Sequence, residues 1–305
     1  MIPLPPEEQK KEAFRLFEDG RYQESLHVCN TVLESGRDPA LEVLAATNLY
    51  YTGRYEDAEV FFRDLAVRMP DSSYVHSYLA KVLEARGDES AIAEYAAAVH
   101  LDPTNQDAVR SYADYLLSRD DFRGALPVLR RLVLLAKKPG DIKNLMRALI
   151  GIGEAEEALA THTRHAADIG KSQEYIDALI KTRNFPAAAQ SAFALWRETQ
   201  DPALLRTYLD AFSRYDLRGS LETYATHLQD CTDGEILFDY VLLLKSSGDL
   251  EQAQKVAGKL LSLCPGEPVY RLVECDILAA AGDEKGALTR YEALVRDELV
   301  SKNDM

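Results

Sequence analysis

Residues 53–65, GRYEDAEVFFRDL, followed by Pro70, decide the fold of this chain. The alanine of this stretch belongs to a series of small residues at intervals of 33, 33, 34, 33, 30, 32, 33 and 34 residues: Ser25, Ala58, Ala91, Ala125, Ala158, Ala188, Ser220, Ala253 and Ala287. A period of this size is typical of a solenoid, in which each unit is too small to bury its own apolar face and packs on its neighbours. The sequence therefore predicts nine stacked units.

Each unit has the pattern of two short helices joined by a turn. A glycine often precedes the small residue by five positions, as Gly53 precedes Ala58, and glycine supplies the left-handed conformation that ends a helix. Large apolar or aromatic residues four and seven positions after the small residue fall on one helical face. We expect proline to stop the second helix, twelve positions after the small residue in three units and two positions later in three others: Pro70, Pro103 and Pro265, and Pro39, Pro139 and Pro202.

Read together, these positions resemble a tetratricopeptide repeat (TPR). The second unit has Ala46, Leu49, Gly53, Ala58 and Phe62 at the diagnostic places, and the third, fourth, eighth and ninth units match well, whereas the fifth to seventh are degenerate. The resemblance covers roughly residues 6–300. It implies an all-α, right-handed superhelix of about nine helical hairpins.

The spacing also predicts how the units are grouped. The interval of 30 residues between Ala158 and Ala188 removes about one helical turn, and His162 and His165 occupy core positions of the fifth unit. We therefore expect two stiffer halves that meet at roughly residues 165–172. The expected organisation is a leader, units one to five, units six to nine, and a tail: residues 1–5, 6–168, 169–300 and 301–305.

Composition and charge argue against several classes of partner and location. The 305 residues carry a formal net charge of −15, which argues against nucleic acid or an anionic membrane surface as the partner. No apolar run approaches the length needed to span a bilayer, and the N-terminal sequence lacks the basic and apolar regions of a secretory signal. The four cysteines are widely spaced, as is usual in a reducing compartment, so we expect a cytoplasmic protein.

No combination of residues predicts catalysis. Phosphate-loop, metalloprotease and nucleophile-elbow motifs are missing, and Gly151 and Gly153 lie between helices instead of after a strand. His162, His165 and Asp168 have a spacing that could chelate a metal, but no further strong ligand is near them in the sequence. We expect no enzymatic activity, no cofactor and no metal; the histidines indicate a polar, loosely packed core.

The family resemblance implies that the first helix of each unit lines a concave groove that holds an extended peptide or a partner helix. Transferred by register, the candidates for partner binding are Phe14, Phe17, Val43, Tyr50, Tyr51, Tyr74, Arg110, Lys143, Arg147, Lys181, Leu205, Leu209, Phe212, Phe238 and Leu242. Core packing is the alternative interpretation of every apolar member. The carboxylate-binding set of the chaperone-binding branch is not reproduced, because Lys10 alone fits it.

Two hypotheses about function follow. The first is a non-enzymatic scaffold or adaptor that binds a protein or peptide in its concave groove. The second is a structural subunit that self-associates or caps a larger assembly through an end repeat, because solenoid ends usually need a cap. An enzyme would need a catalytic domain in addition to the repeats.

Overall fold

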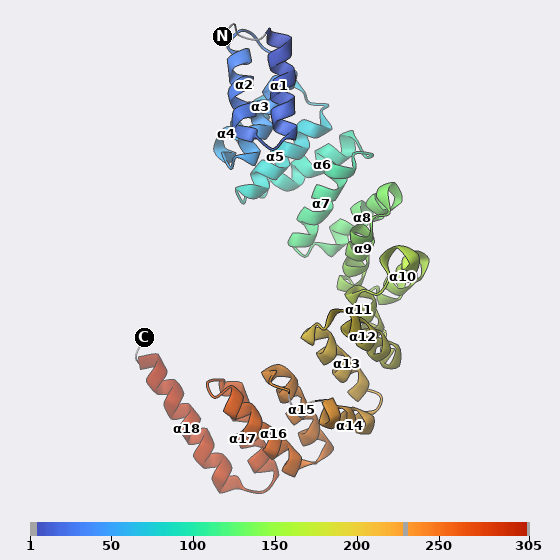
Figure 1. Ribbon diagram of the computed structural model, residues 1–305, viewed down its shortest axis with the longest axis vertical. Helices are drawn as coiled ribbons and strands as arrows, with labels where there is room; N and C mark the ends of the chain where they lie inside the picture. Colours follow the sequence, from blue (N-terminus) through green and yellow to red (C-terminus); the bar gives the residue numbers. More distant parts are fainter. Residues whose placement is uncertain (1–4, 228–230, 304–305) are drawn as a thin grey trace. The chain divides into compact units, whose positions relative to one another are not determined.

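The computed structural model describes residues 5–227 and 231–303, so most of the expected leader and the last two residues of the expected tail lie outside the described residues. Within these ranges the chain forms eighteen helices and no strand (Figure 1). The helices are α1 (Pro6–Glu18), α2 (Tyr22–Leu33), α3 (Pro39–Tyr51), α4 (Tyr55–Arg68), α5 (Ser73–Ala85), α6 (Ala91–Leu101), α7 (Gln106–Ser118), α8 (Phe122–Ala136), α9 (Pro139–Gly151), α10 (Ala155–Ile169), α11 (Gln173–Lys181), α12 (Phe185–Thr199), α13 (Pro202–Ser213), α14 (Leu217–His227), α15 (Gly234–Ser247), α16 (Leu250–Leu263), α17 (Pro268–Ala280) and α18 (Glu284–Asn303).

The helices pair in chain order into nine hairpins, as the repeat predicts. The chain divides into two compact units, residues 1–170 with α1–α10 and residues 171–305 with α11–α18, which we call unit N and unit C. Within each, the second helix of a hairpin packs against the first helix of the next one. First helices also touch one another, as α1, α3, α5 and α7 do in unit N and α15 and α17 do in unit C.

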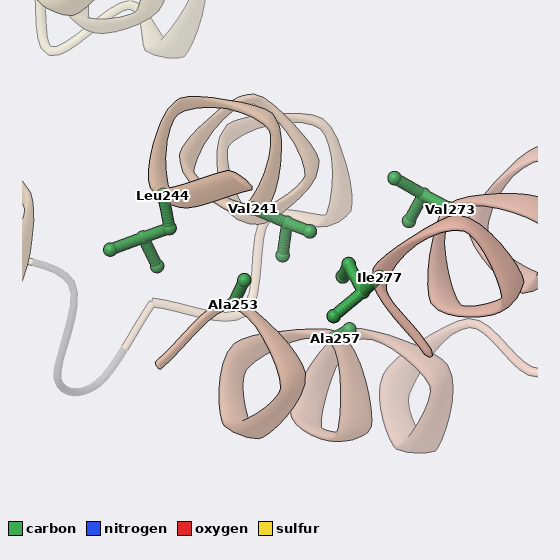
Figure 2. Close-up of a cluster of buried hydrophobic side chains, with 6 residues drawn as sticks. All are labelled: Val241, Leu244, Ala253, Ala257, Val273 and Ile277. Carbon is green, nitrogen blue, oxygen red and sulfur yellow. The ribbon is translucent and has the colours of Figure 1, made fainter. Parts of the chain in front are cut away.

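The recurring small residues are buried in the second helices of the hairpins. All nine are buried, from Ser25 in α2 to Ala287 in α18. Figure 2 shows the arrangement in unit C, where Ala253 and Ala257 of α16 lie beneath Val241 of α15 and Ile277 of α17. A larger side chain at these places would force the helices apart, since protein cores have few gaps.

The turn within a hairpin repeats one hydrogen-bond pattern. Gly53 has a φ of +75°, and the amide of Arg54 donates to the carbonyl of Leu49 over 2.9 Å. This bond, typical of a Schellman motif, satisfies a carbonyl at the helix end. Among the described residues it recurs in eight hairpins, always to a leucine: Arg21–Leu16, Arg54–Leu49, Asp88–Leu83, Asp121–Leu116, Glu154–Leu149, Asn184–Leu179, Asp249–Leu244 and Asp283–Leu278.

Two hairpins keep this turn without glycine. Asp120 and Arg183 stand five positions before their small residues and have φ values of +55° and +60°. The seventh hairpin is different, because the amide of Asp216 donates to Phe212, only four residues earlier. The left-handed conformation therefore recurs at this turn both in hairpins with glycine and in hairpins without it.

The prolines have two roles. Pro70, Pro103 and Pro265 each stand two residues after the end of a second helix, as expected. The prediction for Pro39, Pro139 and Pro202 is wrong, because each is the first residue of the next helix, α3, α9 and α13. Proline is favoured there, since the first helical residue needs no amide hydrogen and its φ is already helical.

The shortened interval falls on one helix. α11 has 9 residues, whereas the first helices of the other hairpins have 12 to 14. Just before it, α10 is interrupted at His165, whose φ of −119° is not helical, and ends at Gly170 with a φ of +58°. His162 and His165 are half-buried instead of occupying a sealed core. At the other end, α18 continues to Asn303, into the expected tail.

Gly53→Ala tests the turn. The added Cβ meets no atom within 4 Å, so the cost is conformational: about 1–2 kcal/mol for a left-handed residue other than glycine. We expect a lower denaturant midpoint by circular dichroism. Gly36→Ala is the matched control, since Gly36 is also open to solvent and lacks a positive φ; equal midpoints for the two variants would contradict this account.

The two serines of the small-residue series should respond differently to alanine. Ser25 donates to the Ala13 carbonyl and accepts from the Asn48 side chain, both over 2.8 Å, whereas Ser220 Oγ is buried with no partner among the described residues. Ser25→Ala should therefore cost about 1 kcal/mol or more, and Ser220→Ala should be neutral or stabilising by about that amount. Denaturant unfolding of both variants measures this; equal losses would be inconsistent with it.

Native-state hydrogen exchange tests the expected junction. The interrupted helix around His165 and the short α11 leave residues 165–172 with less regular backbone than the hairpins on either side. Because repeat arrays open at their weakest interfaces, amides in this segment should exchange faster than those of α3–α4 and α15–α16. Uniform protection along the chain would exclude a weak junction.

Candidate functional site

The N-caps of the first helices fix which residues share a face. Asp38, Ser72, Asp201 and Asp233 each accept a hydrogen bond from the first turn of α3, α5, α13 and α15. Residues five and nine positions after the cap are one helical turn apart and lie on one side of each helix. The pairs are Lys10 and Phe14, Val43 and Thr47, Ser77 and Lys81, Arg110 and Asp114, Lys143 and Arg147, Asp177 and Lys181, Arg206 and Asp210, Phe238 and Leu242, and Leu272 and Asp276.

Aromatic side chains gather on α1, α3 and α5 in unit N. Phe14, Tyr51 and Tyr74 remain 38%, 44% and 41% exposed. The rings of Phe17 and Tyr51 are 5.7 Å apart, and those of Tyr74 and Tyr78 are 4.6 Å apart. The hydroxyls of Tyr51 and Tyr78 lie within 3.2 Å of each other, which links α3 to α5. We call these five residues the tyrosine face.

The chemistry of the tyrosine face is that of neutral phenols beside a cation. A tyrosine hydroxyl is protonated at neutral pH, and burial raises the pKa of Tyr78 further. Lys81 lies over the Tyr78 ring, with Nζ 4.7 Å from the centroid, and burial lowers the pKa of this amine. The face therefore offers hydroxyl groups and ring surfaces beside an amine.

Ring contacts link three of the predicted residues, Phe17, Tyr51 and Tyr74, through Tyr78, and Phe14 lies about one helical turn before Phe17 on α1. Tyr50 is half-buried, with its ring 5.8 Å from Tyr55 and from Tyr78, and Val43 is half-buried on the same helix. The sequence reasoning missed Tyr78 as a member of this group. Its place one helical turn after Tyr74 was the signal that could have identified it.

The predicted basic residues of α7 and α9 have different surroundings. Arg110 donates to both carboxylate oxygens of Asp141, over 3.2 and 3.0 Å, and that carboxylate is buried. Arg110 therefore helps to hold α7 against α9. Lys143 is half-buried and Arg147 is exposed, and neither forms an ion pair within the described part of the chain.

Unit C has a cavity of about 600 Å³ on its first helices. It lies between α11, α13 and α15, with Tyr224 of α14 in its wall. Its lining is largely charged and otherwise apolar or hydroxylic: Asp177, Ile180, Arg206, Thr207, Asp210, Ser213, Arg214, Tyr224, Asp239, Leu242, Leu243 and Ser246.

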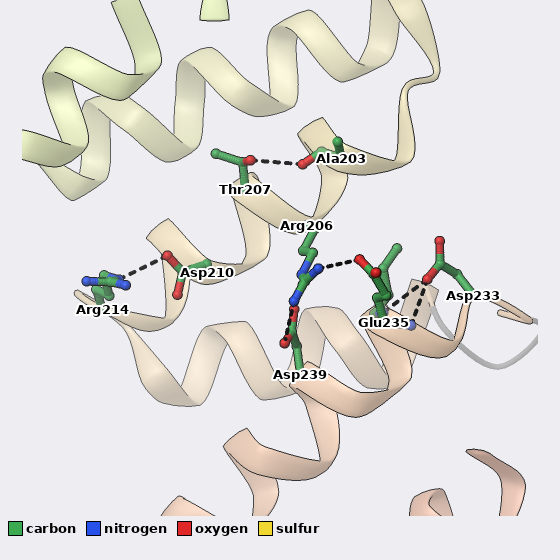
Figure 3. A network of polar contacts seen from close by, with 9 residues as sticks. Ala203, Arg206, Thr207, Asp210, Arg214, Asp233, Glu235 and Asp239 are labelled. Atoms are coloured by element: carbon green, nitrogen blue, oxygen red, sulfur yellow. Dashed lines mark hydrogen bonds and ion pairs between the residues drawn. The ribbon is translucent and has the colours of Figure 1, made fainter. Parts of the chain in front are cut away.

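Ion pairs engage the guanidinium groups of this cavity (Figure 3). Arg206 donates through Nε and Nη2 to the carboxylate of Asp239, and through Nη1 to Glu235. Arg214 Nε donates to Asp210 over 3.0 Å. Each arginine thus already has a carboxylate partner from this unit.

Asp177 has a different environment from the other carboxylates of the cavity. Its Oδ1 accepts a hydrogen bond of 2.8 Å from the side-chain amide of Gln173, and no ion pair within 4 Å joins it to a cation of the described residues. Burial raises the pKa of Asp177. A half-buried carboxylate that lacks a cationic partner favours an incoming positive charge.

On α13 the residues that line the cavity each stand one position after a predicted residue. Arg206, Asp210 and Ser213 line the cavity, whereas the prediction named Leu205, Leu209 and Phe212. Leu209 is 1% exposed and packs with Tyr224 and Ile236, so it is a core residue; Leu205 packs against the same cluster.

Phe212 of α13 is turned toward α14. Its ring lies 5.6 Å from that of Tyr208, and a Cβ on Gly219 of α14 would be 3.1 Å from it. Counting from the Asp201 cap would have identified the correct face, because positions five and nine after it are Arg206 and Asp210.

The remaining predicted residues of unit C stay predictions. Leu242 is exposed and lines the cavity, Phe238 is half-buried with its ring 5.1 Å from Tyr270, and Lys181 is exposed one turn after Asp177. Leu272 is also exposed, on the neighbouring α17.

The described residues hold no group of three or more histidine, cysteine, aspartate or glutamate side chains placed to bind a metal. His162 Nε2 lies 3.2 Å from the Gly170 carbonyl, whereas His165 Nδ1 lies 3.4 Å from Asp168. The four cysteines form no disulfide. Among the described helices, none combines the length and apolarity that a membrane span requires.

Neither a scan of protein-family models nor a search of curated proteins finds a match to this chain. Solved structures do match. The C-terminal part of a TPR repeat-containing protein from Cytophaga hutchinsonii is 19% identical, with a TM-score of 0.52, over 86% of this chain and 97% of that one. A thermophilic TPR protein of Thermus thermophilus is 17% identical, with a TM-score of 0.43, over 58% of this chain and 99% of that one.

The match to the Cytophaga structure agrees with the three features described above: buried small residues, left-handed turns and paired helices. It concerns the fold. A likeness of 19% identity bears on architecture and leaves activity and partners open. Over its described residues the chain has the all-α TPR fold, with nine helical hairpins.

Proposed function

We propose that this protein is a non-enzymatic scaffold that binds a protein or peptide on the faces formed by its first helices. The observation that carries the proposal is the tyrosine face, where Phe14, Tyr51 and Tyr74 stay exposed on three neighbouring helices. Exposure of large aromatic side chains to water is unfavourable in free energy, and clusters of them at a surface are characteristic of binding sites.

The tyrosine face has the properties of a preformed binding surface. Ring contacts and the hydroxyl pair of Tyr51 and Tyr78 hold the side chains in place, so little rotamer entropy is lost when a partner binds. Each ring offers apolar area and each hydroxyl a hydrogen bond. This combination suits a peptide backbone with apolar side chains.

The test is capture of partners with the tagged full-length protein, followed by quantitative mass spectrometry. Tyr51→Ser combined with Tyr74→Ser should reduce recovery of a specific partner by about tenfold or more, because such anchors often contribute more than 1.4 kcal/mol. Helicity and the unfolding midpoint should be checked in the same preparation.

The matched control is Val60→Ser combined with Val67→Ser, which changes two exposed side chains, 69% and 82% accessible, on the second helix α4. This variant should keep the partner. If the α4 variant loses the partner and the tyrosine variant retains it, the second helices carry binding and the proposal is wrong.

A further inference from the structure

We propose that the cavity of unit C binds a basic side chain, arginine or lysine, from a partner segment that carries apolar residues beside it. The inference rests on the proposed function, and it names the chemistry of the partner that the first helices of unit C would select. It is carried by the cavity, its charges and the apolar surface next to it.

The charges of the cavity leave one carboxylate available. Arg206 is shared by Asp239 and Glu235, and Arg214 is paired with Asp210. The carboxylates that line the cavity with these two arginines are Asp177, Asp210 and Asp239, so three negative charges face two positive charges. Lys181, one turn along α11, does not line the cavity. The balance inside the cavity is negative, so an incoming cation is attracted and an incoming carboxylate repelled.

The walls fit the stem of a long basic side chain. Ile180, Leu242 and Leu243 supply apolar surface, and Tyr224 closes the wall from α14. Arginine and lysine place methylene groups along such surface and keep the charged group at a polar end. Here the polar end is Asp177, and Asp210 lines the same cavity.

The surface beside the cavity is apolar. Leu242 of α15 and Leu272 and Val269 of α17 are all exposed, and α15 and α17 are in contact. A segment that places a basic side chain between α11 and α15 would therefore continue over apolar side chains on α17. Neighbouring helices are about 10 Å apart, which an extended chain spans in about three residues.

A phage library of random dodecapeptides, selected against the full-length protein, tests the proposal. We expect the peptides recovered to be enriched in arginine or lysine within a few residues of leucine, isoleucine or phenylalanine. In a selected peptide, replacement of the key arginine by citrulline, or of the key lysine by its acetylated form, removes the charge. Binding should weaken about tenfold or more.

The protein variants assign the effect to the cavity. Asp177→Asn keeps the shape of the side chain and removes its charge. It should weaken binding of the charged peptide about tenfold and change binding of the uncharged peptide little. Glu198→Gln is the matched control, since Glu198 is an exposed carboxylate of unit C that pairs with Lys171 outside the cavity. It should leave binding of both peptides unchanged.

The outcomes separate this inference from the function it rests on. Selected peptides that lack basic residues, or that bind the Asp177→Asn variant equally well, overturn the inference and leave the scaffold proposal standing. Recovery of no binding peptide from the library, in a preparation that is folded by circular dichroism, counts against both.

Discussion

The hydrogen bond that closes eight of the nine described hairpins is the interaction on which the rest of the structure depends. The amide after the left-handed turn residue donates to a leucine carbonyl five residues earlier, as Arg54 does to Leu49. This bond ends the first helix at a fixed place and starts the second helix so that a small residue meets the first one. The same geometry in successive hairpins lets each pack on the next, and stability then accumulates from neighbour to neighbour.

A fixed turn also fixes the surface. Once the cap of a first helix is set, the helical period decides which of its residues share a face. In this way Tyr51 of α3 meets Tyr78 of α5, and Asp177, Arg206 and Asp239 come from three helices to one cavity. The framework is repetitive, whereas the chemistry of each position is free to vary.

The sequence predicts the hairpins because their determinants are local. The buried series from Ser25 to Ala287 and the glycines of the turns could be read directly. The turns at Asp120 and Arg183 could not be predicted from glycine, because residues other than glycine adopt the left-handed conformation there. The prediction for Pro139 is wrong because proline is common both after the end of a helix and at its first residue. The observed start of α9 at Pro139 distinguishes these two roles.

The surface was predicted less completely for a physical reason. On α13 the apolar residues Leu205, Leu209 and Phe212 and the charged residues Arg206 and Asp210 both recur at helical spacing, so periodicity alone gives two faces. The N-cap Asp201 distinguishes them in the structure. The ion pair of Arg110 with Asp141 could not be predicted from the sequence either, because it joins neighbouring hairpins.

The most direct test of the account is to locate a bound peptide on the protein. A peptide selected from the library and carrying a photoreactive side chain can be cross-linked to the full-length protein, and the modified residues identified by mass spectrometry. The account predicts cross-links on first helices, such as α3 and α5 in unit N or α11, α13 and α15 in unit C. Cross-links confined to the second helices α4, α12 and α16 would contradict it.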